Sequence, residues 1–534
     1  RAAVAHARGA APPAPGGGGG AAGRVYPVFV LDGDAYQLRR CSALRASFLV
    51  ESLRELDREL RSRGSRLYVA SGDPVQVLPQ LWERLGVTHL TFEADETGEP
   101  YAQRRDAAVL SAAKAAGMSA EAHATETLYP LGAYVARSGG DPANVPATMG
   151  AYEKLFARMG KAPPAPLDMP TTAEFKSELR DVVGGDEMLP PRSPTDLPWP
   201  RETPRAQVEP VWNAADCEGL SPVARGGERE ALNRLRSCMS RHAWVASFEK
   251  PKTLPTALSP STTALSPYLS LGCLSPRTMW HGVVESAASA PAGAPRSKPP
   301  VSLHGQLMWR DFSNLMAHSA NAECAGSWGQ MEGNRYCRAI EWGEDAELLA
   351  AWKEARTGYP WIDACMMQLR TEGWVHHLGR HALACFLTRG DLWQHWERGA
   401  EHFEGQLLDA DYALNGFNWL WLSCSGFFYQ YFRCYSPVAF QKKNDPSGAF
   451  IRKWLPQLRK LPDKYIYEPW TAPIAVQKSA GIIIGTDYPK PVVDHKVVSK
   501  ENMGKVAKAY EAYKKTQSSG AGGGPPKKKL KAGK

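Results

Sequence analysis

Short apolar runs alternate with amphipathic stretches through the first quarter of the chain. Three runs rich in Val, Leu, Phe and Tyr have the length of buried strands; they are residues 25–31, 66–70 and 88–92. Three amphipathic stretches with helical spacing are residues 42–63, 74–85 and 99–116. This alternation predicts a parallel sheet with helices on both faces, so we expect an α/β, Rossmann-like domain over residues 24–134.

The pattern changes to helix alone in the second half. Apolar positions recur with the 3.6-residue period of an α-helix in four segments, residues 227–248, 304–320, 346–355 and 361–387. We therefore predict a larger, all-α C-terminal domain over residues 226–515.

Low-complexity and proline-rich segments occupy the rest. Residues 1–23 are rich in Ala, Pro and Gly and are expected to be disordered. Residues 135–225 are predicted to be an interdomain connector, because ten prolines between Pro163 and Pro204 exclude a continuous helix there. Residues 516–534 are expected to form a flexible basic tail.

The composition is that of a globular protein. The 534 residues, 43% hydrophobic and 22% charged, suffice for two or three domains. Ten cysteines without a Cys-x-x-Cys pair favour reduced thiols over a disulfide framework or a zinc module. No apolar run approaches the roughly 18 residues of a membrane span, so we expect no membrane partner.

The net charge of +9 says little about partners. The last eight residues supply five of these positive charges, so binding to nucleic acid would need a local basic patch. The same tail carries PPKKKLK at residues 525–531, which is typical of a nuclear import signal and predicts a nuclear location.

Residues 374–396 carry the most informative candidate chemistry. His377 and His381 lie one predicted helical turn apart, and Trp374, Trp393 and Trp396 fall on the same or the adjoining helix. Imidazole moves protons near neutral pH, and indole is easily oxidised by one electron. Together they predict redox or light-driven chemistry on a bound cofactor.

The histidines have two other interpretations. His377, His381 and Cys385 recur every four residues, but no further Cys/His cluster completes a tetrahedral metal site, so a metal is disfavoured. Two hydrogen-bonded core histidines would give the same spacing.

Polar pairs elsewhere are also ambiguous alone. Thr263 and Ser266 precede a predicted helix, where hydroxyls suit either an ordinary N-cap or a bound diphosphate. Asp409 and Asp411 are paired acids that fit metal binding or acid–base work.

Several long blocks resemble the cryptochrome/photolyase family, and specifically its branch of animal-like cryptochromes and (6-4) photolyases. The similarity extends from about Val25 to Lys515 and is densest in residues 261–277, 301–312, 357–393, 407–423 and 465–495. The resemblance implies an N-terminal α/β antenna domain and a C-terminal helical domain that holds FAD in a folded-back shape.

One departure concerns the start of the α/β domain. The family's first strand and its arginine-rich loop are missing here, and a glycine-rich stretch leads into what corresponds to the second strand. Two explanations are open: either the chain is truncated, or the sheet lacks a central strand. An antenna chromophore, 8-hydroxy-5-deazaflavin or a folate, is implied by the family and left open by this departure.

The resemblance assigns a set of cofactor-binding positions. They are Thr263, Ser266, Gln306, Arg310, Trp374, His377, Asp409, Asp411 and Asn415. The two hydroxyls correspond to contacts with the FAD phosphates, and the two aspartates lie along the flavin. The amide faces the flavin N5, where it cannot readily supply a proton and so favours full reduction of the flavin.

The resemblance also implies an electron relay and a lesion pocket. The relay, from the flavin outward, is Trp419, Trp396, Trp342 and Trp393. Trp393 and Trp396 have the i,i+3 spacing of one helix face. His377 and His381 are the implied catalytic acid–base pair. Residues that would line the lesion pocket are Lys250, Pro300, Gln306, Trp309, Trp421 and Tyr435. Arg310 and residues 441–443 are candidates for DNA phosphates.

The resemblance therefore predicts a monomeric enzyme that uses light and FAD to repair (6-4) photoproducts in UV-damaged DNA. The alternative is an animal-like cryptochrome, a blue-light photoreceptor or circadian transcriptional regulator with clock or signalling proteins as partners. One chain can combine both roles. The short tail favours the enzyme, and repair of cyclobutane dimers is disfavoured because His377 and His381 replace the Asn and Met of those enzymes.

Overall fold

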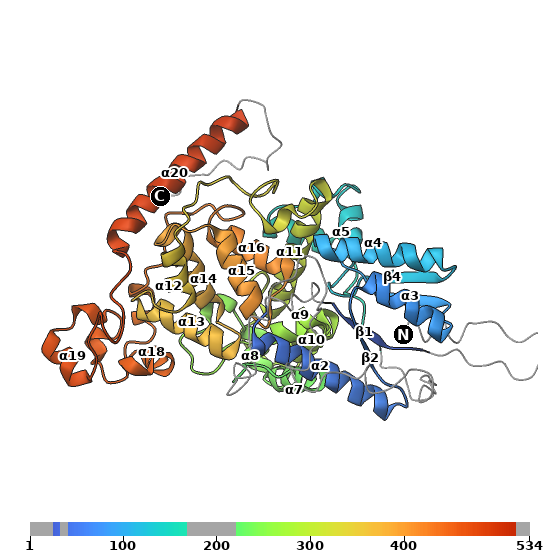
Figure 1. Cartoon of the computed structure of the whole chain (residues 1–534), viewed down its shortest axis with the longest axis horizontal. Coiled ribbons are helices and arrows are strands. Elements are labelled where there is room, and N and C mark those ends of the chain that lie inside the picture. The colour runs from blue at the N-terminus through green and yellow to red at the C-terminus, as the bar shows by residue number, and fades with distance from the viewer. Residues whose placement is uncertain (1–24, 33–40, 168–220, 519–534) are drawn as a thin grey trace, which may run out of the picture.

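The chain forms an α/β part and a larger helical part (Figure 1). In the computed structural model, the described residues are 25–32, 41–167 and 221–518. The α/β part, in blue, lies at one end of the molecule, and the helices after residue 228 fill the remainder. The predicted fold class is confirmed. The predicted disordered segment 1–23 and the motif at 525–531 lie outside the described residues.

Strands and helices alternate in the α/β part as predicted. The strands are β1 (Val28–Leu31), β2 (Tyr68–Ser71), β3 (His89–Glu93) and β4 (Ser119–His123). The helices between them are α2 (Ala43–Ser62), α3 (Pro74–Leu85) and α4 (Pro100–Ala115). The three helices agree with their predicted ranges to within one residue at each end, whereas β4 falls outside the predicted strands.

The prediction of one continuous sheet is wrong for the described strands. β1 pairs in parallel with β2, and β3 pairs in parallel with β4, in two separate pairs. Each pair is parallel, as predicted, and only the continuity of the sheet differs among the described strands.

Local capping explains why these helices were predictable. The Ser42 hydroxyl accepts a hydrogen bond from the first turn of α2. Asp73 caps α3 in the same way, Pro74 occupies its first position, and Gly86 ends it with a left-handed φ of 61°.

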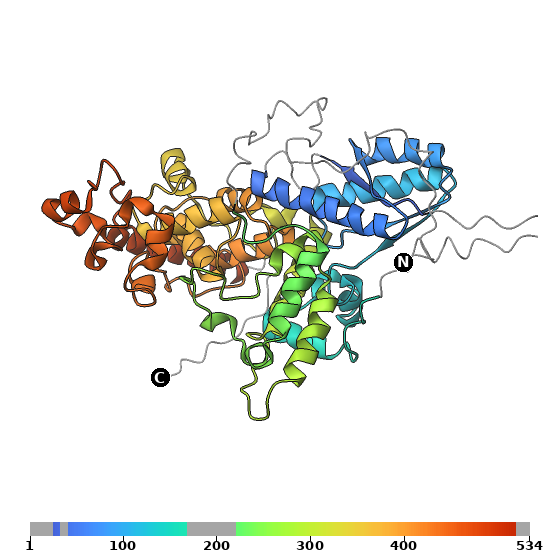
Figure 2. The ribbon, with the colours of Figure 1, turned by 90° about the horizontal axis from the view of Figure 1, so that it is seen from below.

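The helical part consists of short and medium helices around one large core. They are α7 (Glu228–Met239), α8 (His242–Ser247), α9 (Ser266–Leu271), α10 (Pro276–Ala288), α11 (Leu303–Glu323), α12 (Ala346–Lys353), α13 (Pro360–Glu372), α14 (His377–Cys385), α15 (Trp396–Gln406), α16 (Tyr412–Leu422), α17 (Ala439–Lys442), α18 (Ala449–Trp454), α19 (Ile474–Ala480) and α20 (His495–Ser518). Short 3-10 helices are η2 (Pro142–Asn144), η7 (Lys250–Lys252), η8 (Ser327–Gly329), η10 (Pro456–Leu458), η11 (Asp463–Tyr465) and η12 (Pro469–Thr471). In both views, which differ by a rotation of 90°, α20 lies away from the α/β part (Figures 1 and 2). No helix among the described residues is long and apolar enough to cross a membrane.

The first part of the predicted connector belongs to the core, which corrects the prediction for residues 135–225. α5 (Leu131–Arg137) spans residue 135, where the connector was predicted to begin, and α6 (Met149–Ala157) lies within the predicted connector. Tyr134 and Tyr152, both fully buried, share a hydrogen bond of 3.0 Å. The Tyr134 hydroxyl also donates to Asp311 of α11 over 2.8 Å, so these helices are fixed to the centre of the helical part.

The segment around residues 374–396 is less regular than predicted. Trp374 lies in the turn between α13 and α14, and a π-helical turn, η9 (Phe386–Gly390), follows α14. Trp393 lies in the next turn with a φ of 56°, and only Trp396 begins a helix. The predicted i,i+3 placement of Trp393 and Trp396 on one helix face is therefore wrong, because Trp393 lies outside the helix that Trp396 begins.

Candidate active site

α14 carries the two predicted catalytic histidines one turn apart, which confirms their spacing. The ring centroids of His377 and His381 are 5.7 Å apart, with ring planes at 86°. A third histidine, His376, is the N-cap of the helix, and its ring lies 4.3 Å from that of His377. The three imidazoles thus form one cluster at the start of α14.

Hydrogen bonds fix the protonated nitrogen of His376. Its Nδ1 accepts the backbone N–H of Leu378 over 3.2 Å, and its Nε2 lies 2.8 Å from the Thr253 hydroxyl. That hydroxyl donates to the Lys250 carbonyl over 2.6 Å, so it accepts from the imidazole. His376 is therefore a neutral ring with its proton on Nε2, and it serves to start the helix.

The electrostatics keep all three imidazoles neutral at pH 7. Burial, together with the nearby Lys250 ammonium, lowers the pKa of His376 and of His381 to about 3. The same causes hold the pKa of His377 well below its usual range. Burial, with the Arg380 charge, lowers the pKa of Lys250 itself to about 8. A dissociable proton close to neutrality is thus on Lys250.

The two catalytic candidates differ in their partners. His381 Nδ1 lies 3.2 Å from the Tyr435 hydroxyl. His377 Nδ1 is buried and has no hydrogen-bond partner among the described residues. A buried imidazole nitrogen without a partner is costly, so His377 Nδ1 is available for a hydrogen bond to a ligand.

Asp409 links α9, α14 and the loop before α16. Its Oδ2 accepts hydrogen bonds from the Ser266 hydroxyl over 2.6 Å and from Arg380 Nη2 over 2.8 Å. Its Oδ1 is buried and has no partner among the described residues. Two predicted cofactor-binding residues, Ser266 and Asp409, are therefore in direct contact.

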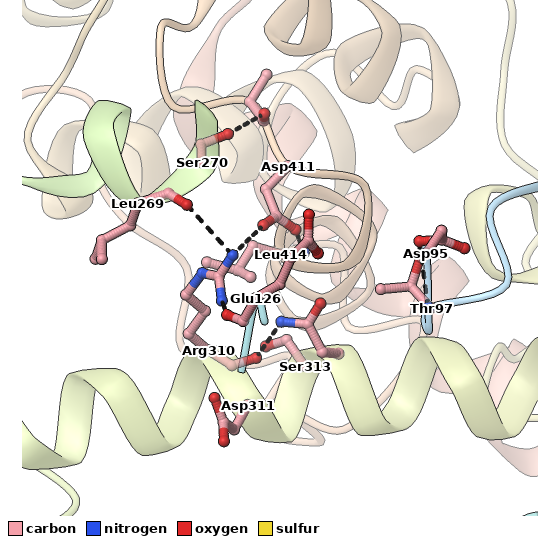
Figure 3. A network of polar contacts seen from close by, with 12 residues as sticks. Asp95, Thr97, Glu126, Leu269, Ser270, Arg310, Asp311, Ser313, Asp411 and Leu414 are labelled. Carbon is pink, nitrogen blue, oxygen red and sulfur yellow. Dashed lines mark hydrogen bonds and ion pairs between the residues drawn. The ribbon is translucent and has the colours of Figure 1, made fainter. Parts of the chain in front are cut away.

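Asp411 forms a second centre with Arg310 of α11 (Figure 3). The guanidinium lies 3.5 Å from Asp411 Oδ2 and also donates to the backbone carbonyls of Glu126 and Leu269. Asp411 Oδ1 meanwhile caps α16. Burial raises the pKa of Glu126 to about 7, against the opposing effect of Arg310. Since Arg310 is buried and bonded to these groups, the suggestion that it engages DNA phosphates is wrong.

The remaining cofactor candidates are spread around these two centres. Thr263 lies in the turn that leads into α9, and Trp374 is buried before α14, with its ring 6.4 Å from that of His376. Asn415 of α16 donates its amide to the Ala400 carbonyl over 3.0 Å. Its backbone N–H donates to the Asp411 carbonyl over 2.8 Å, so Asn415 is in direct contact with the second centre.

The inner pair of predicted relay tryptophans lies on adjacent helices. Trp396 of α15 and Trp419 of α16 are both fully buried. Gly399, one turn after Trp396, allows the approach, because a Cβ there would lie 2.1 Å from the Trp419 ring. The absence of a side chain at this glycine therefore lets the two helices come together at the indoles.

The outer pair of relay tryptophans is in contact. The Trp342 and Trp393 rings have centroids 4.7 Å apart, and the Gly343 backbone donates to the Trp393 carbonyl over 2.9 Å. Both indoles are partly exposed. The ammonium of Lys505, on α20, lies 4.7 Å from the centre of the Trp393 ring.

The predicted lesion-pocket residues form three local groups. The Gln306 side chain donates to the Pro300 carbonyl over 3.1 Å. The Lys250 backbone N–H donates to the carbonyl of the next residue after Pro300, Val301, over 3.0 Å. Trp309 lies on α11 one turn after Gln306, and its ring meets that of Trp421 edge to face at 5.7 Å. The third group is Tyr435 with His381.

Two residues of this site escaped sequence reasoning. His376 directly precedes a predicted helix, and its N-cap position was a signal that could have singled it out. Arg380 is separated by 29 positions from Asp409, its partner. Nothing in the local pattern connects these two, so only the fold reveals the ion pair.

Two family models match the chain. Residues 302–508 match the FAD binding domain of DNA photolyase, and residues 3–166 match DNA photolyase. A (6-4) DNA photolyase of Oryza sativa subsp. japonica is 44% identical over 92% of this chain and 85% of its own length. Cryptochrome-2 of Gallus gallus is 42% identical over 88% of this chain and 75% of its own length.

The fold agrees with these matches. A bacterial class III photolyase from Agrobacterium tumefaciens superposes with a TM-score of 0.72 at 25% identity and covers 92% of each chain. The protein is thus a two-part, mainly helical flavoprotein by fold and matched domain. It belongs to the photolyase/cryptochrome family.

The residues present fit FAD as the cofactor. The buried Asp409 Oδ1, which has no partner among the described residues, can accept hydrogen bonds. FAD carries hydroxyls and ring N–H groups that complement this atom. Ser266, Asp409, Asp411 and Asn415 are the residues that would hold it.

Proposed function

We propose that this protein is an enzyme that uses light and FAD to repair (6-4) pyrimidine–pyrimidone photoproducts in UV-damaged DNA. The observation that supports this most is the partly buried imidazole pair of α14. The buried His377 Nδ1 has no partner among the described residues, and the His381 ring lies 5.7 Å from the His377 ring. Repair of this lesion returns a group from one base to its neighbour and requires a proton. When bound, FAD supplies light absorption and one-electron transfer.

Purified, reduced protein illuminated with an oligonucleotide that contains the lesion tests this proposal. Return of intact pyrimidines, followed chromatographically, is the expected result. Binding of the oligonucleotide without turnover would refute the enzymatic function and support the receptor discussed below.

The residues of the pocket divide the work of handling the proton. His377 faces the reacting group and passes the proton, while His381, oriented by Tyr435, supports it from the same helix face. Both rings are neutral at pH 7, so the proton that they pass on comes from another group. Lys250, whose pKa is lowered to about 8, supplies that proton. Trp309 and Trp421 offer faces on which an extruded base can stack.

Repair should decline as the pH rises through about 8. Lys250 is protonated below its lowered pKa and loses its proton above it, so the source of protons is present at neutral pH and absent in alkali. Lys250→Met should slow repair and remove this alkaline decline, measured as repair rate against pH at constant light. The matched control is Lys252→Met, because Lys252 is an exposed neighbour that pairs with Glu249. An unchanged pH profile in Lys250→Met would contradict the role.

The tryptophans should carry electrons between the protein surface and the buried cofactor. Trp396→Phe should therefore retain FAD yet lose most light-driven reduction of it by an external reductant, because a phenyl ring is much harder to oxidise than indole. The absorbance of the cofactor under blue light measures this. Trp361→Phe is the matched control, since Trp361 is equally buried and outside the predicted relay. Equal photoreduction in the two variants would rule out the relay.

A second candidate function is that of a light receptor that signals to a partner protein. The observation in its favour is that Lys505 of α20, near the C-terminal end, contacts the outermost predicted relay ring. Oxidation of that ring would place two positive charges next to each other, which weakens the contact. The illumination experiment above separates this function from repair.

Three further attributes belong to the proposal. The protein acts as a monomer on DNA, clock or signalling proteins are the partners of the receptor alternative, and the lysines of residues 525–531 direct it to the nucleus. A deazaflavin or a folate is the antenna chromophore that the family would supply.

A further inference from the structure

A threonine next to the imidazole cluster is hydrogen-bonded on two sides. Thr253 directly follows η7, the short helix that begins with Lys250. Its hydroxyl donates to the Lys250 carbonyl over 2.6 Å and accepts from His376 Nε2 over 2.8 Å. One side chain therefore joins the loop that carries Lys250 to the residue that caps α14.

The bond to His376 determines how α14 begins. Because Nε2 carries the proton that Thr253 accepts, Nδ1 can accept the Leu378 N–H over 3.2 Å. That bond is the N-cap of α14, and His377 is the first residue of the helix. Without the hydroxyl, the buried Nε2–H would lose its acceptor, and moving the proton to Nδ1 would remove the cap instead. Either result loosens the backbone that carries the His377 ring.

The bonds to the loop determine where Lys250 lies. Thr253 holds the Lys250 carbonyl with its hydroxyl and also with its backbone N–H, over 2.6 and 3.2 Å. On the other side, the Lys250 N–H donates to the Val301 carbonyl over 3.0 Å. Both backbone polar groups of Lys250 are therefore fixed, and so is the point from which its side chain extends.

The ammonium of Lys250 is sensitive to that position. Burial is the largest effect on its pKa and, with the Arg380 charge, lowers it to about 8, whereas Asp409 opposes this. The ammonium is in turn the largest charge effect on the pKa of each of the three clustered imidazoles. A loop that moved into water would therefore raise the pKa of Lys250 and weaken its effect on the histidines.

We propose that Thr253 is a positioning residue of the repair site, which holds the Lys250 ammonium and the His377 ring in a fixed relation through its hydroxyl. It acts through these two residues and not on the substrate. This inference deepens the proposed function. Its effect on the loop and the helix start holds without repair, whereas its effect on the repair rate rests on that function.

Thr253→Val removes the hydroxyl and keeps the shape of the side chain, and we expect three changes in the FAD-loaded full chain. The titration of Lys250, followed by amine labelling and mass spectrometry at a series of pH values, should move upward by about one pH unit. The amide of Leu378 should exchange with deuterium about tenfold faster, because its acceptor is loosened. Repair at saturating DNA should slow about tenfold, since small displacements near reacting groups have such effects.

Three further variants serve as controls. Thr253→Ser retains the hydroxyl and should restore all three properties, and Thr253→Ala is a second removal of the hydroxyl in case valine impairs folding. The matched control is Thr471→Val. The exposed Thr471 also ends a 3-10 helix and donates to the carbonyl three residues earlier, that of Glu468, over 2.7 Å. This variant should behave as the parent protein does.

The outcomes separate this role from the function itself. Parent-like titration of Lys250 and parent-like exchange at Leu378 in Thr253→Val and Thr253→Ala would overturn the proposal. It is equally overturned if both properties change while repair does not, or if Thr253→Ser fails to restore them. A parent protein that does not repair the lesion would instead refute the proposed function, and the first two measurements would still decide the role of Thr253.

Discussion

His377→Ala should reduce repair of the (6-4) photoproduct by about 10²-fold or more, the usual contribution of a positioned acid–base group. The variant should retain FAD and its light-driven reduction, since the predicted relay does not include this residue. His377 Nδ1 is buried without a partner, and its ring lies 5.7 Å from that of His381. Two measurements separate repair from photoreduction: the number of lesions repaired per absorbed photon, and the yield of cofactor reduction under the same light.

The matched control for this variant is His402→Ala. His402 of α15 is also partly buried, its buried Nε2 has no hydrogen-bond partner among the described residues, and burial lowers its pKa to about 3. It packs edge to face against Trp352, outside the predicted pocket. Its loss should affect stability and leave repair per folded molecule unchanged. Undiminished repair in His377→Ala would remove that residue from the mechanism.

Asp409→Ala should have the largest effect on stability and on cofactor retention. Removing one partner of a buried ion pair leaves the other without compensation, at a cost of about 3 kcal/mol. Here Arg380, with only 23% of its side chain exposed, would lose its carboxylate, and Ser266 would lose its acceptor. Thermal unfolding and the FAD content of the purified protein measure the two effects.

Two further variants make this prediction specific. Arg380→Met combined with Asp409→Ala should cost less than the sum of the single changes, because the residual charge is then removed. Asp463→Ala breaks an exposed ion pair with Arg452, with Asp463 67% exposed, and should cost at most about 1 kcal/mol. A parent-like melting temperature and full FAD content in Asp409→Ala would contradict the assignment.

The sequence was informative where local signals determine structure. α2, α3 and α4 were predicted to within one residue because caps such as Ser42 and Asp73, together with apolar spacing, define helix ends locally. β4, residues 119–123, was missed because its sequence SAEAH contains no β-branched or large apolar residue. Its only apolar side chains are two alanines, and it pairs with β3 as a strand. Its structure is set by a partner about 30 residues away.

The site was predictable in its residue types and not in its connections. The spacing of His377 and His381 follows from helix geometry alone. Trp393, by contrast, has a left-handed backbone conformation that an indole rarely adopts, and the turn after η9 imposes it. The ion pair of Arg380 with Asp409 likewise depends on packing between distant elements. The roles of these residues remain predictions for the experiments above.

The two separate strand pairs have a consequence for the autonomy of the α/β part. The four strands among the described residues form two separate pairs, so contacts with the helical part contribute to the cohesion of this half. α2 supplies such contacts: the Ser42 backbone donates to the Gly405 carbonyl over 2.8 Å, and Glu51 accepts the Gly226 N–H over 2.7 Å. The N-terminal half is thus a dependent lobe, and it would not be expected to fold if severed from the helices on which it rests.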